Sequence, residues 1–418
     1  MQILSSLKRY TKDLLVYGLG NILSFLLPVA FLPIFTNILC QEDYGLSASF
    51  LALTQIFIVV ISVGSVSAVS RGFYEDWDKD EFGSYIFNGL LINAASLLIM
   101  LFFVLMLANL FSQDSSWFFI TVFAVISGFL ITIKDYKHKI WNLEKKSTAY
   151  AVFQNCLTFS LYFLTLILIL FVFPDWRSRV YGFLIANLLF AILSLIFLLK
   201  ENKPNISFEI GKIKSLLSFG APLLLHGLGI ALLASADKLL LSSLENLSSV
   251  GVLAVATAIA GIMSIPIIAV DLTLNPRIQE LLKNHSVQSY LTIRKLSYLT
   301  FLTYVMSGIV LYSITPIIFK YFIGSDFQSS KDFVGYLIIG QIFYGMYRFY
   351  VRPIFFSKKT LLVTLSTFLS GILSLVIMYF LILSLQATGA AIGTMIGYFV
   401  ACMMAMVFAK KANPSWKF

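Results

Sequence analysis

Long, uninterrupted apolar stretches dominate this chain and decide what it can fold into. Most are roughly 20 residues long, the length that an α-helix needs to cross the about 30 Å of hydrocarbon in a membrane. They lack the alternating segments of about ten residues that build an outer-membrane barrel. Of the 418 residues, 59% are hydrophobic and 12% are charged, whereas an average soluble domain has about 25% charged residues. The sequence therefore predicts an all-α polytopic membrane protein.

The apolar stretches predict twelve transmembrane helices. They cover residues 14–37, 46–70, 84–110, 117–133, 148–173, 180–199, 215–241, 250–274, 296–319, 333–350, 361–384 and 389–409. The basic N-terminus leads into the first of them without a small-residue cleavage site, which favours a retained helix over a signal peptide.

The positive charges are distributed unevenly between alternate loops. With a cytoplasmic N-terminus, 25 of the 30 lysines and arginines fall in inner segments or, for Arg348, at the inner end of a span; four fall in outer loops, and Lys238 falls inside a span. Positive residues accumulate on the cytoplasmic side of membrane proteins, so we predict that both termini lie in the cytoplasm. The net charge of +10 thus reflects topology rather than nucleic-acid binding, because no loop is long enough to form a basic domain.

The two halves of the chain share an internal repeat. Gly45 and Arg71 are 26 residues apart, and so are Gly251 and Arg277. Each half holds six predicted spans and therefore starts on the same side of the membrane, which predicts two six-helix bundles with pseudo-two-fold symmetry along the membrane normal. The predicted bundles are residues 1–199 and 215–418, and the predicted cytoplasmic linker is 200–214.

Motifs for enzyme chemistry are absent from the sequence. His138, His226 and His285 lie on separate segments, which excludes HExxH and similar metal-ligand spacings. There is no GxSxG motif, no P-loop and no CxxC pair among the three cysteines. We therefore predict a transport protein without a catalytic site, a metal site or a cofactor.

Two adjacent charges, Asp237 and Lys238, lie in the seventh span, where no other charge occurs between Lys214 and Glu245. A charge facing lipid at the membrane centre costs roughly 2.5–3.5 kcal/mol on insertion scales. In one interpretation Lys238 snorkels to the outer interface and Asp237 pairs with it. We favour a second interpretation, in which the pair faces a polar cavity between the bundles. Neighbouring residues point about 100° apart on a helix, so the two need not form a direct bridge: one can face this cavity while the other reaches a neighbouring helix. In this interpretation Lys238 is displayed to an anionic substrate and Asp237 keeps the ammonium charged.

Four arginines near span ends are further candidates for binding an anion. They are Arg71, Arg277, Arg348 and Arg352. Topology alone explains cytoplasmic arginines; the alternative is that they bind an anionic head group or pair with a coupled acid, such as Glu75 or Asp271. His226 is a candidate proton carrier because histidine titrates near neutrality, although a structural core histidine is the more common case.

Three segments of the chain resemble a known family. They are "FLPIFTNILCQEDYGLSASFLAL" followed by "SRGFYE", "ASADKLLLSSLENLSSVGVLAVATAI", and "ATGAAIGTMIGYFVACMM". Together they are similar to the first two helices, spans seven and eight, and the last helix of Wzx-type polysaccharide flippases. These flippases belong to the multidrug/oligosaccharidyl-lipid/polysaccharide exporter superfamily. Two departures are Asn37, where the family often has arginine, and Lys238, where arginine is more usual.

The resemblance implies a transport function. A flippase of this type moves an undecaprenyl-diphosphate-linked oligosaccharide, used for O-antigen or another surface polysaccharide, from the cytoplasmic to the outer leaflet by alternating access. The resemblance also implies membrane lipid as a partner, polymerase and chain-length proteins of the same pathway as further partners, and coupling to H⁺ or Na⁺. Two alternatives stay open: an ion-coupled multidrug antiporter, which the acid-poor spans disfavour, and a glycan polymerase or glycosyltransferase, which the short outer loops disfavour.

The predicted topology can be tested by cysteine labelling. In a variant without native cysteines, we expect a cysteine at Ser248 to be blocked by a membrane-impermeant reagent added outside, because this residue belongs to a predicted outer loop. A cysteine at Lys145 belongs to a predicted inner loop and should be labelled only by permeant reagents. The reverse pattern would contradict the assignment of sides.

Overall fold

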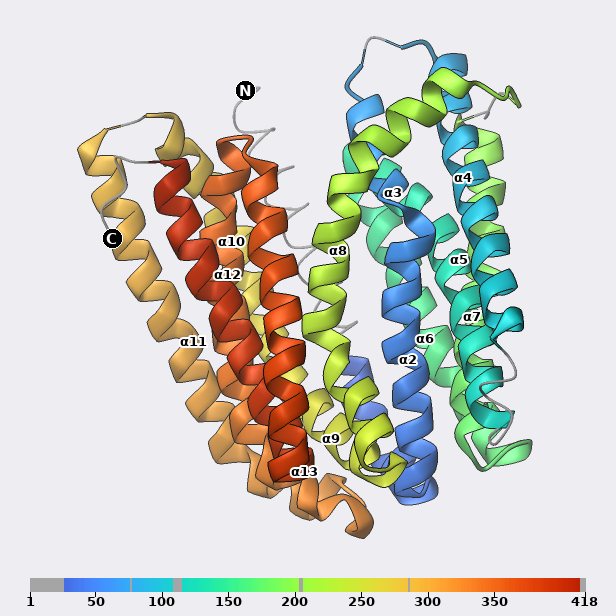
Figure 1. Ribbon diagram of the computed structural model, residues 1–418, viewed down its shortest axis with the longest axis vertical. Helices are drawn as coiled ribbons and strands as arrows, with labels where there is room; N and C mark the ends of the chain where they lie inside the picture. The colour runs from blue at the N-terminus through green and yellow to red at the C-terminus, as the bar shows by residue number, and fades with distance from the viewer. Residues whose placement is uncertain (1–25, 76, 108–114, 203–205, 285, 414–418) are drawn as a thin grey trace. The chain divides into compact units, whose positions relative to one another are not determined.

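The computed structural model is helical throughout the part of the chain that it describes (Figure 1). The described residues are 26–75, 77–107, 115–202, 206–284 and 286–413. Helices satisfy their own backbone hydrogen bonds, which no water can do inside the hydrocarbon. The beginning of the first predicted span and His285 lie outside the described residues.

The helices follow the predicted spans in chain order. They are Leu26–Ile38, α2 (Gln41–Ser62), α3 (Ser65–Gly72), α4 (Lys79–Met106), α5 (Ser115–Leu143), α6 (Ser147–Phe171), α7 (Trp176–Phe197), a π-helical turn (Leu198–Asn202), α8 (Ile210–Leu244), α9 (Leu247–Ala260), a 3-10 turn (Gly261–Met263), α10 (Ser264–Lys283), α11 (Val287–Phe322), a second 3-10 turn (Ser325–Ser330), α12 (Lys331–Phe356) and α13 (Thr360–Ala412). Within the described ranges, nine helical stretches are long and apolar enough to cross a membrane.

The predicted second and eighth spans are each broken into two pieces. Between α2 and α3 the backbone passes through positive φ at Val63 (46°) and Gly64 (72°). Between α9 and α10 a 3-10 turn covers Gly261–Met263. Pro266 explains the second break, because its ring would clash with the carbonyl four residues earlier in a continuous α-helix.

The last two predicted spans form a packed hairpin within α13. Gln386, with φ 53° and ψ −135°, interrupts the helix between them. A Cβ at Gly389, Gly393 or Gly397 would overlap with Leu381, Met378 or Ser374, respectively. The spacing of three intervening residues keeps these glycines on one face, so the two halves approach closely. The GxxxGxxxG spacing in the sequence predicts such a packing surface, and the structure confirms it.

The repeat-related glycines Gly45 and Gly251 meet directly. A Cβ on Gly45 would lie 3.0 Å from the backbone nitrogen of Gly251, and a Cβ on Gly251 would lie 3.1 Å from that of Gly45. Each glycine also lies against a carbonyl at the start of the other helix, Leu247 or Gln41. Only residues without a side chain allow this crossing of α2 and α9.

Contacts divide the chain into two compact units. Of the described residues, unit 1 contains 46–231, and unit 2 contains 26–45 and 232–413. The divisions fall inside α2 and α8 rather than in the linker 200–214, because the ends of these helices pack with different neighbours. The bundles 1–199 and 215–418, which were drawn from the repeat, stay a prediction.

The fourth predicted span, 117–133, is shorter than the helix that contains it. That helix, α5, continues to Leu143. Lys137, expected in a loop, is fully buried and its Nζ lies 3.0 Å from Glu201 Oε2 and 2.8 Å from Asn202 Oδ1. The apolar run ends at residue 133 because the rest of α5 carries polar and charged side chains. Ion pairs and hydrogen bonds allow some of these side chains to be buried, and a hydropathy pattern does not reveal such contacts.

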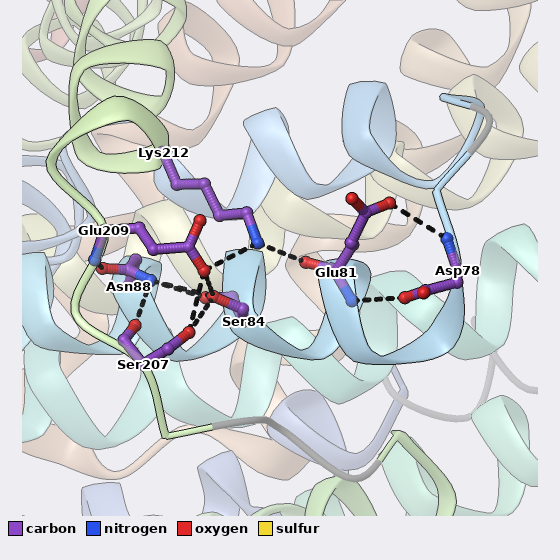
Figure 2. Close-up of polar contacts among 7 residues, drawn as sticks. All are labelled: Asp78, Glu81, Ser84, Asn88, Ser207, Glu209 and Lys212. Atoms are coloured by element: carbon purple, nitrogen blue, oxygen red, sulfur yellow. Dashed lines mark hydrogen bonds and ion pairs between the residues drawn. The ribbon is translucent and has the colours of Figure 1, made fainter.

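A polar cluster fastens the linker to the beginning of α4 (Figure 2). Glu209 accepts hydrogen bonds from Ser84 (2.6 Å), Ser207 (2.8 Å) and Lys212 (3.0 Å). The Glu209 backbone N–H donates to Asn88 Oδ1 at 3.0 Å. The Ser84 hydroxyl, then the Lys212 ammonium and the Ser207 hydroxyl, hold the pKa of Glu209 at about 2. The start of α8 is therefore tied to unit 1 by a charged carboxylate.

This cluster predicts a local loss of stability in acid. The pKa of Glu209 is depressed from 4.5 to about 2, so its contribution is fully present above pH 4.5 and is lost as the pH falls through that window. We expect amide hydrogen exchange at residues 206–212, corrected for intrinsic rates, to accelerate over this range. Glu209→Gln should exchange faster already at pH 7 and lose the acid dependence. Equal acid responses in both proteins would assign the effect to another group.

Candidate functional site

One face of α12 carries a tyrosine and two arginines. Tyr344, Arg348 and Arg352 are four residues apart, so they follow one another along a single side of the helix. Arg348 Nη1 donates to the Tyr344 hydroxyl at 3.4 Å, and its guanidinium lies 5.7 Å from the centre of the Tyr344 ring. The helix thus presents two cations and an aromatic ring together.

A single carboxylate joins the two arginines. Asp271 on α10 accepts from Arg348 Nη2 through Oδ2 and from Arg352 Nη2 through Oδ1. Asp271 and Arg352 are mostly buried, whereas 39% of the Arg348 side chain is exposed. Arg352 Nη1 is buried and has no hydrogen-bond partner among the described residues. Asp271, Arg348 and Arg352, which we call the Asp271 cluster, therefore carry one excess positive charge and a buried N–H donor at Arg352 Nη1 that is not used. Both features suit the cluster to binding an anion.

A stack of tyrosines continues from this cluster. The Tyr344 ring centre lies 5.2 Å from that of Tyr398 on α13 and 6.3 Å from that of Tyr347. Tyr398 is 8% exposed, and the adjacent Gly397 lies against Leu233 on α8. The tyrosines thus continue from the Asp271 cluster to α13, on the side of α13 that packs against α8.

Asp237 and Lys238 bind each other directly. Lys238 Nζ lies 3.0 Å from Asp237 Oδ2 and 3.1 Å from Oδ1, and the two side chains are 2% and 12% exposed. The two residues thus form the direct bridge that their directions on the helix left open. The flexible lysine stem folds back over the carboxylate, because both groups are buried on α8 and a charge without a partner there is costly.

Among the described residues, the ion pairs of the repeat-related arginines are local. Arg71 Nε lies 3.3 Å from Glu75 Oε1, and Arg277 Nη1 lies 2.8 Å from Glu280 Oε2, with all four side chains at least 41% exposed. Exposed pairs of this kind stabilise little. The expected pairing of Arg71 with Glu75 occurs, but Asp271 pairs with α12 rather than with Arg277.

The remaining candidate residues lie apart from these clusters or were not predicted from the sequence. His226 is half-buried on α8 in unit 1, whereas the Asp237–Lys238 pair and the Asp271 cluster belong to unit 2. Tyr344 and Tyr398 were missed, although the spacing of Tyr344 from the two arginines could have indicated a shared face. Within the described ranges, no three metal-binding side chains gather into a possible metal site.

The sequence was compared with known families and proteins. Residues 10–282 match the family described as "Polysaccharide biosynthesis protein". The chain belongs to this family. Two relatives from Haemophilus influenzae (strain ATCC 51907 / DSM 11121 / KW20 / Rd) are each 23% identical: Lsg locus protein 1, over 367 residues, and an uncharacterized membrane protein, over 369 residues. Each alignment covers 87% of this chain and 88% of the relative.

Solved structures share the fold. The lipid II flippase MurJ in an inward closed conformation has a TM-score of 0.75 and 18% identity, covering 95% of this chain and 87% of its own. An inward-facing multidrug resistance MATE transporter of the MOP superfamily has a TM-score of 0.70 and 14% identity, covering 96% and 95%. Both likenesses confirm the predicted all-α fold.

The Asp271 cluster predicts an asymmetric effect on stability. Asp271→Asn leaves two guanidinium groups side by side without an anion and should lower the free energy of unfolding in detergent by roughly 3 kcal/mol, as for other broken buried pairs. Adding Arg352→Gln should restore part of this loss, because it removes the more deeply buried cation. Glu280→Gln, which breaks an exposed pair, is the matched control. If Asp271→Asn lowers the free energy of unfolding no more than Glu280→Gln does, the contacts of Asp271 with the two arginines do not stabilise the fold.

Proposed function

We propose that this family member is a flippase that moves an undecaprenyl-diphosphate-linked oligosaccharide from the cytoplasmic to the outer leaflet of the bacterial cell membrane by alternating access. The observation that carries this proposal is the Asp271 cluster: two arginines, one carboxylate and a tyrosine stack on α10, α12 and α13. A substrate made of an anion and a sugar needs cations to bind the anion and aromatic, hydroxyl-bearing side chains to contact the sugar.

The charges of the cluster suit a diphosphate. A guanidinium binds phosphate oxygens through two parallel hydrogen bonds. Asp271 holds both guanidinium groups in place while no phosphate is bound, and the half-exposed Arg348 can exchange part of its contact with Asp271 for a phosphate oxygen. Because the carboxylate offsets only one of the two positive charges, the cluster attracts an anion without holding it too tightly for release.

The tyrosines suit the sugar part of the substrate. Their rings offer apolar faces for stacking and their hydroxyl groups can donate and accept hydrogen bonds. They lie beside the arginines on α12 and continue to α13, and Lys238 on α8 supplies a further cation in the same unit. The polyprenyl chain needs no polar path, because it can remain in the lipid.

The pairing of the acids supports a flippase over a multidrug antiporter. An acid that binds a cationic drug, H⁺ or Na⁺ must be available to it. Asp237 and Asp271, the two acids identified inside long spans, are each paired with a lysine or with arginines. Coupling to H⁺ or Na⁺, if the transporter uses it, would require one of these pairs to open.

Removal of the protein from its host tests the proposal. We expect a lipid-linked oligosaccharide to accumulate, to be identifiable by mass spectrometry of extracted lipids, and to be inaccessible to lectins added outside spheroplasts. Accumulation of single repeat units on the outer face would instead indicate a polymerase. Normal surface glycan combined with sensitivity to cationic drugs would indicate an antiporter.

Variants of the charge pair extend the same assay. Lys238→Ala should abolish transport, whereas Lys238→Arg should retain it, because arginine keeps the cation. The double variant Asp237→Asn/Lys238→Ala leaves no unpaired charge, so it should insert at the normal level in membrane fractions and still fail to transport. Normal transport by the double variant would show that the pair is only structural.

A further inference from the structure

A groove runs between α11 and α12 on unit 2. It has a volume of about 720 Å³ and is lined by α11 from Phe301 to Ser313 and by α12 from Lys331 to Phe343. Its lining is mainly apolar. Ile338 and Ile342 are 3% and 8% exposed and pack against Gly308, where a Cβ would meet both side chains. The missing side chain of Gly308 lets these residues form a recessed floor.

The walls of the groove are apolar side chains that the protein itself leaves uncovered. Phe301, Ile309, Tyr312 and Ile339 are 44%, 55%, 59% and 43% exposed. In a protein that crosses a membrane, such surfaces lie against hydrocarbon chains. A recess between two helices can hold a single chain more firmly than a flat surface, because the chain contacts both walls and the floor.

The length of the groove matches one leaflet. Each lining stretch advances twelve residues along its helix, which is about 18 Å at 1.5 Å per residue. This is slightly more than half of the about 30 Å hydrocarbon thickness. Lys331 starts α12, so the groove extends from the membrane surface at Lys331 towards the membrane centre at Phe343 and Phe301. In the predicted topology this surface is the outer one.

Charged and aromatic residues mark the surface end. Lys331 and Asp332 are adjacent, exposed and part of the groove lining. Tyr312 and Tyr336 line the same end, with the Tyr312 ring 3.3 Å from the position of a Cβ on Gly335. Tyrosine side chains are typical of the head-group region. An ammonium and a carboxylate at this level match a head group that carries both charges.

We propose that this groove is a binding site for an aminophospholipid of the phosphatidylethanolamine class. One acyl chain fills the groove, Lys331 binds the phosphate, and Asp332 binds the primary ammonium of the head group. An anionic phospholipid would satisfy Lys331 but would place negative charge beside Asp332. A polyprenyl diphosphate would face the same repulsion, and its chain is longer than one leaflet. The proposal does not depend on which substrate the transporter carries.

Lipid binding to the purified full-length protein tests the site. Dioleoyl-phosphatidylethanolamine, -phosphatidylglycerol and -phosphatidylcholine are added separately to delipidated protein in detergent, and bound lipid is counted by native mass spectrometry. Two exposed charge contacts predict a roughly tenfold tighter binding of phosphatidylethanolamine than of the other two lipids. Equal binding of all three, or tighter binding of phosphatidylglycerol, would overturn the proposal.

Variants separate the head group from the chain. Lys331→Gln should lower phosphatidylethanolamine binding, whereas Asp332→Asn should shift the preference to phosphatidylglycerol, because the lysine then remains without an acid. Ile309→Trp should fill the groove and remove binding of all three lipids. Val310→Trp is the matched control: Val310 is 54% exposed, close to the 55% of Ile309, and is not part of the groove. Equal effects of the two tryptophan variants would contradict the groove as the site.

Discussion

The requirement that every polar group in the hydrocarbon find a partner within the protein governs this structure. For the backbone it makes α-helices the only solution open to separate apolar segments. It also explains how the helices end or bend. Among the described residues, the predicted second and eighth spans and α13 leave α-helical geometry at Gly64, at the turn before Pro266 and at Gln386, respectively.

The same requirement applied to side chains gives ion pairs. Asp237 is covered by Lys238, Asp271 by two arginines, and Lys137 by Glu201. In most of these pairs the positive and negative charges cancel. In the Asp271 cluster they do not, because one carboxylate faces two guanidinium groups, and this imbalance gives the protein a cationic site inside a membrane domain.

Close packing of small residues sets the geometry in which these charges meet. The crossing at Gly45 and Gly251 brings α2 and α9 into backbone contact, and Gly397 brings α13 within reach of Leu233 on α8. The second contact places Tyr398 close to Asp237. In a membrane, where lipid competes with side chains for apolar contact, such close approaches stabilise helix association.

The sequence by itself determined the fold class, the order of the spans, the glycine packing face and most residues of the candidate site, because these depend on local hydrophobicity, spacing and residue chemistry. Only the tertiary structure decided which charges pair. The partners of Asp271 lie about eighty residues away on α12, while Arg277, its neighbour on α10, pairs with Glu280. The direct Asp237–Lys238 bridge was decided in the same way, since burial of both groups outweighed their divergent directions on the helix. Helix–helix packing fixes such choices, and no local pattern records which helices become neighbours.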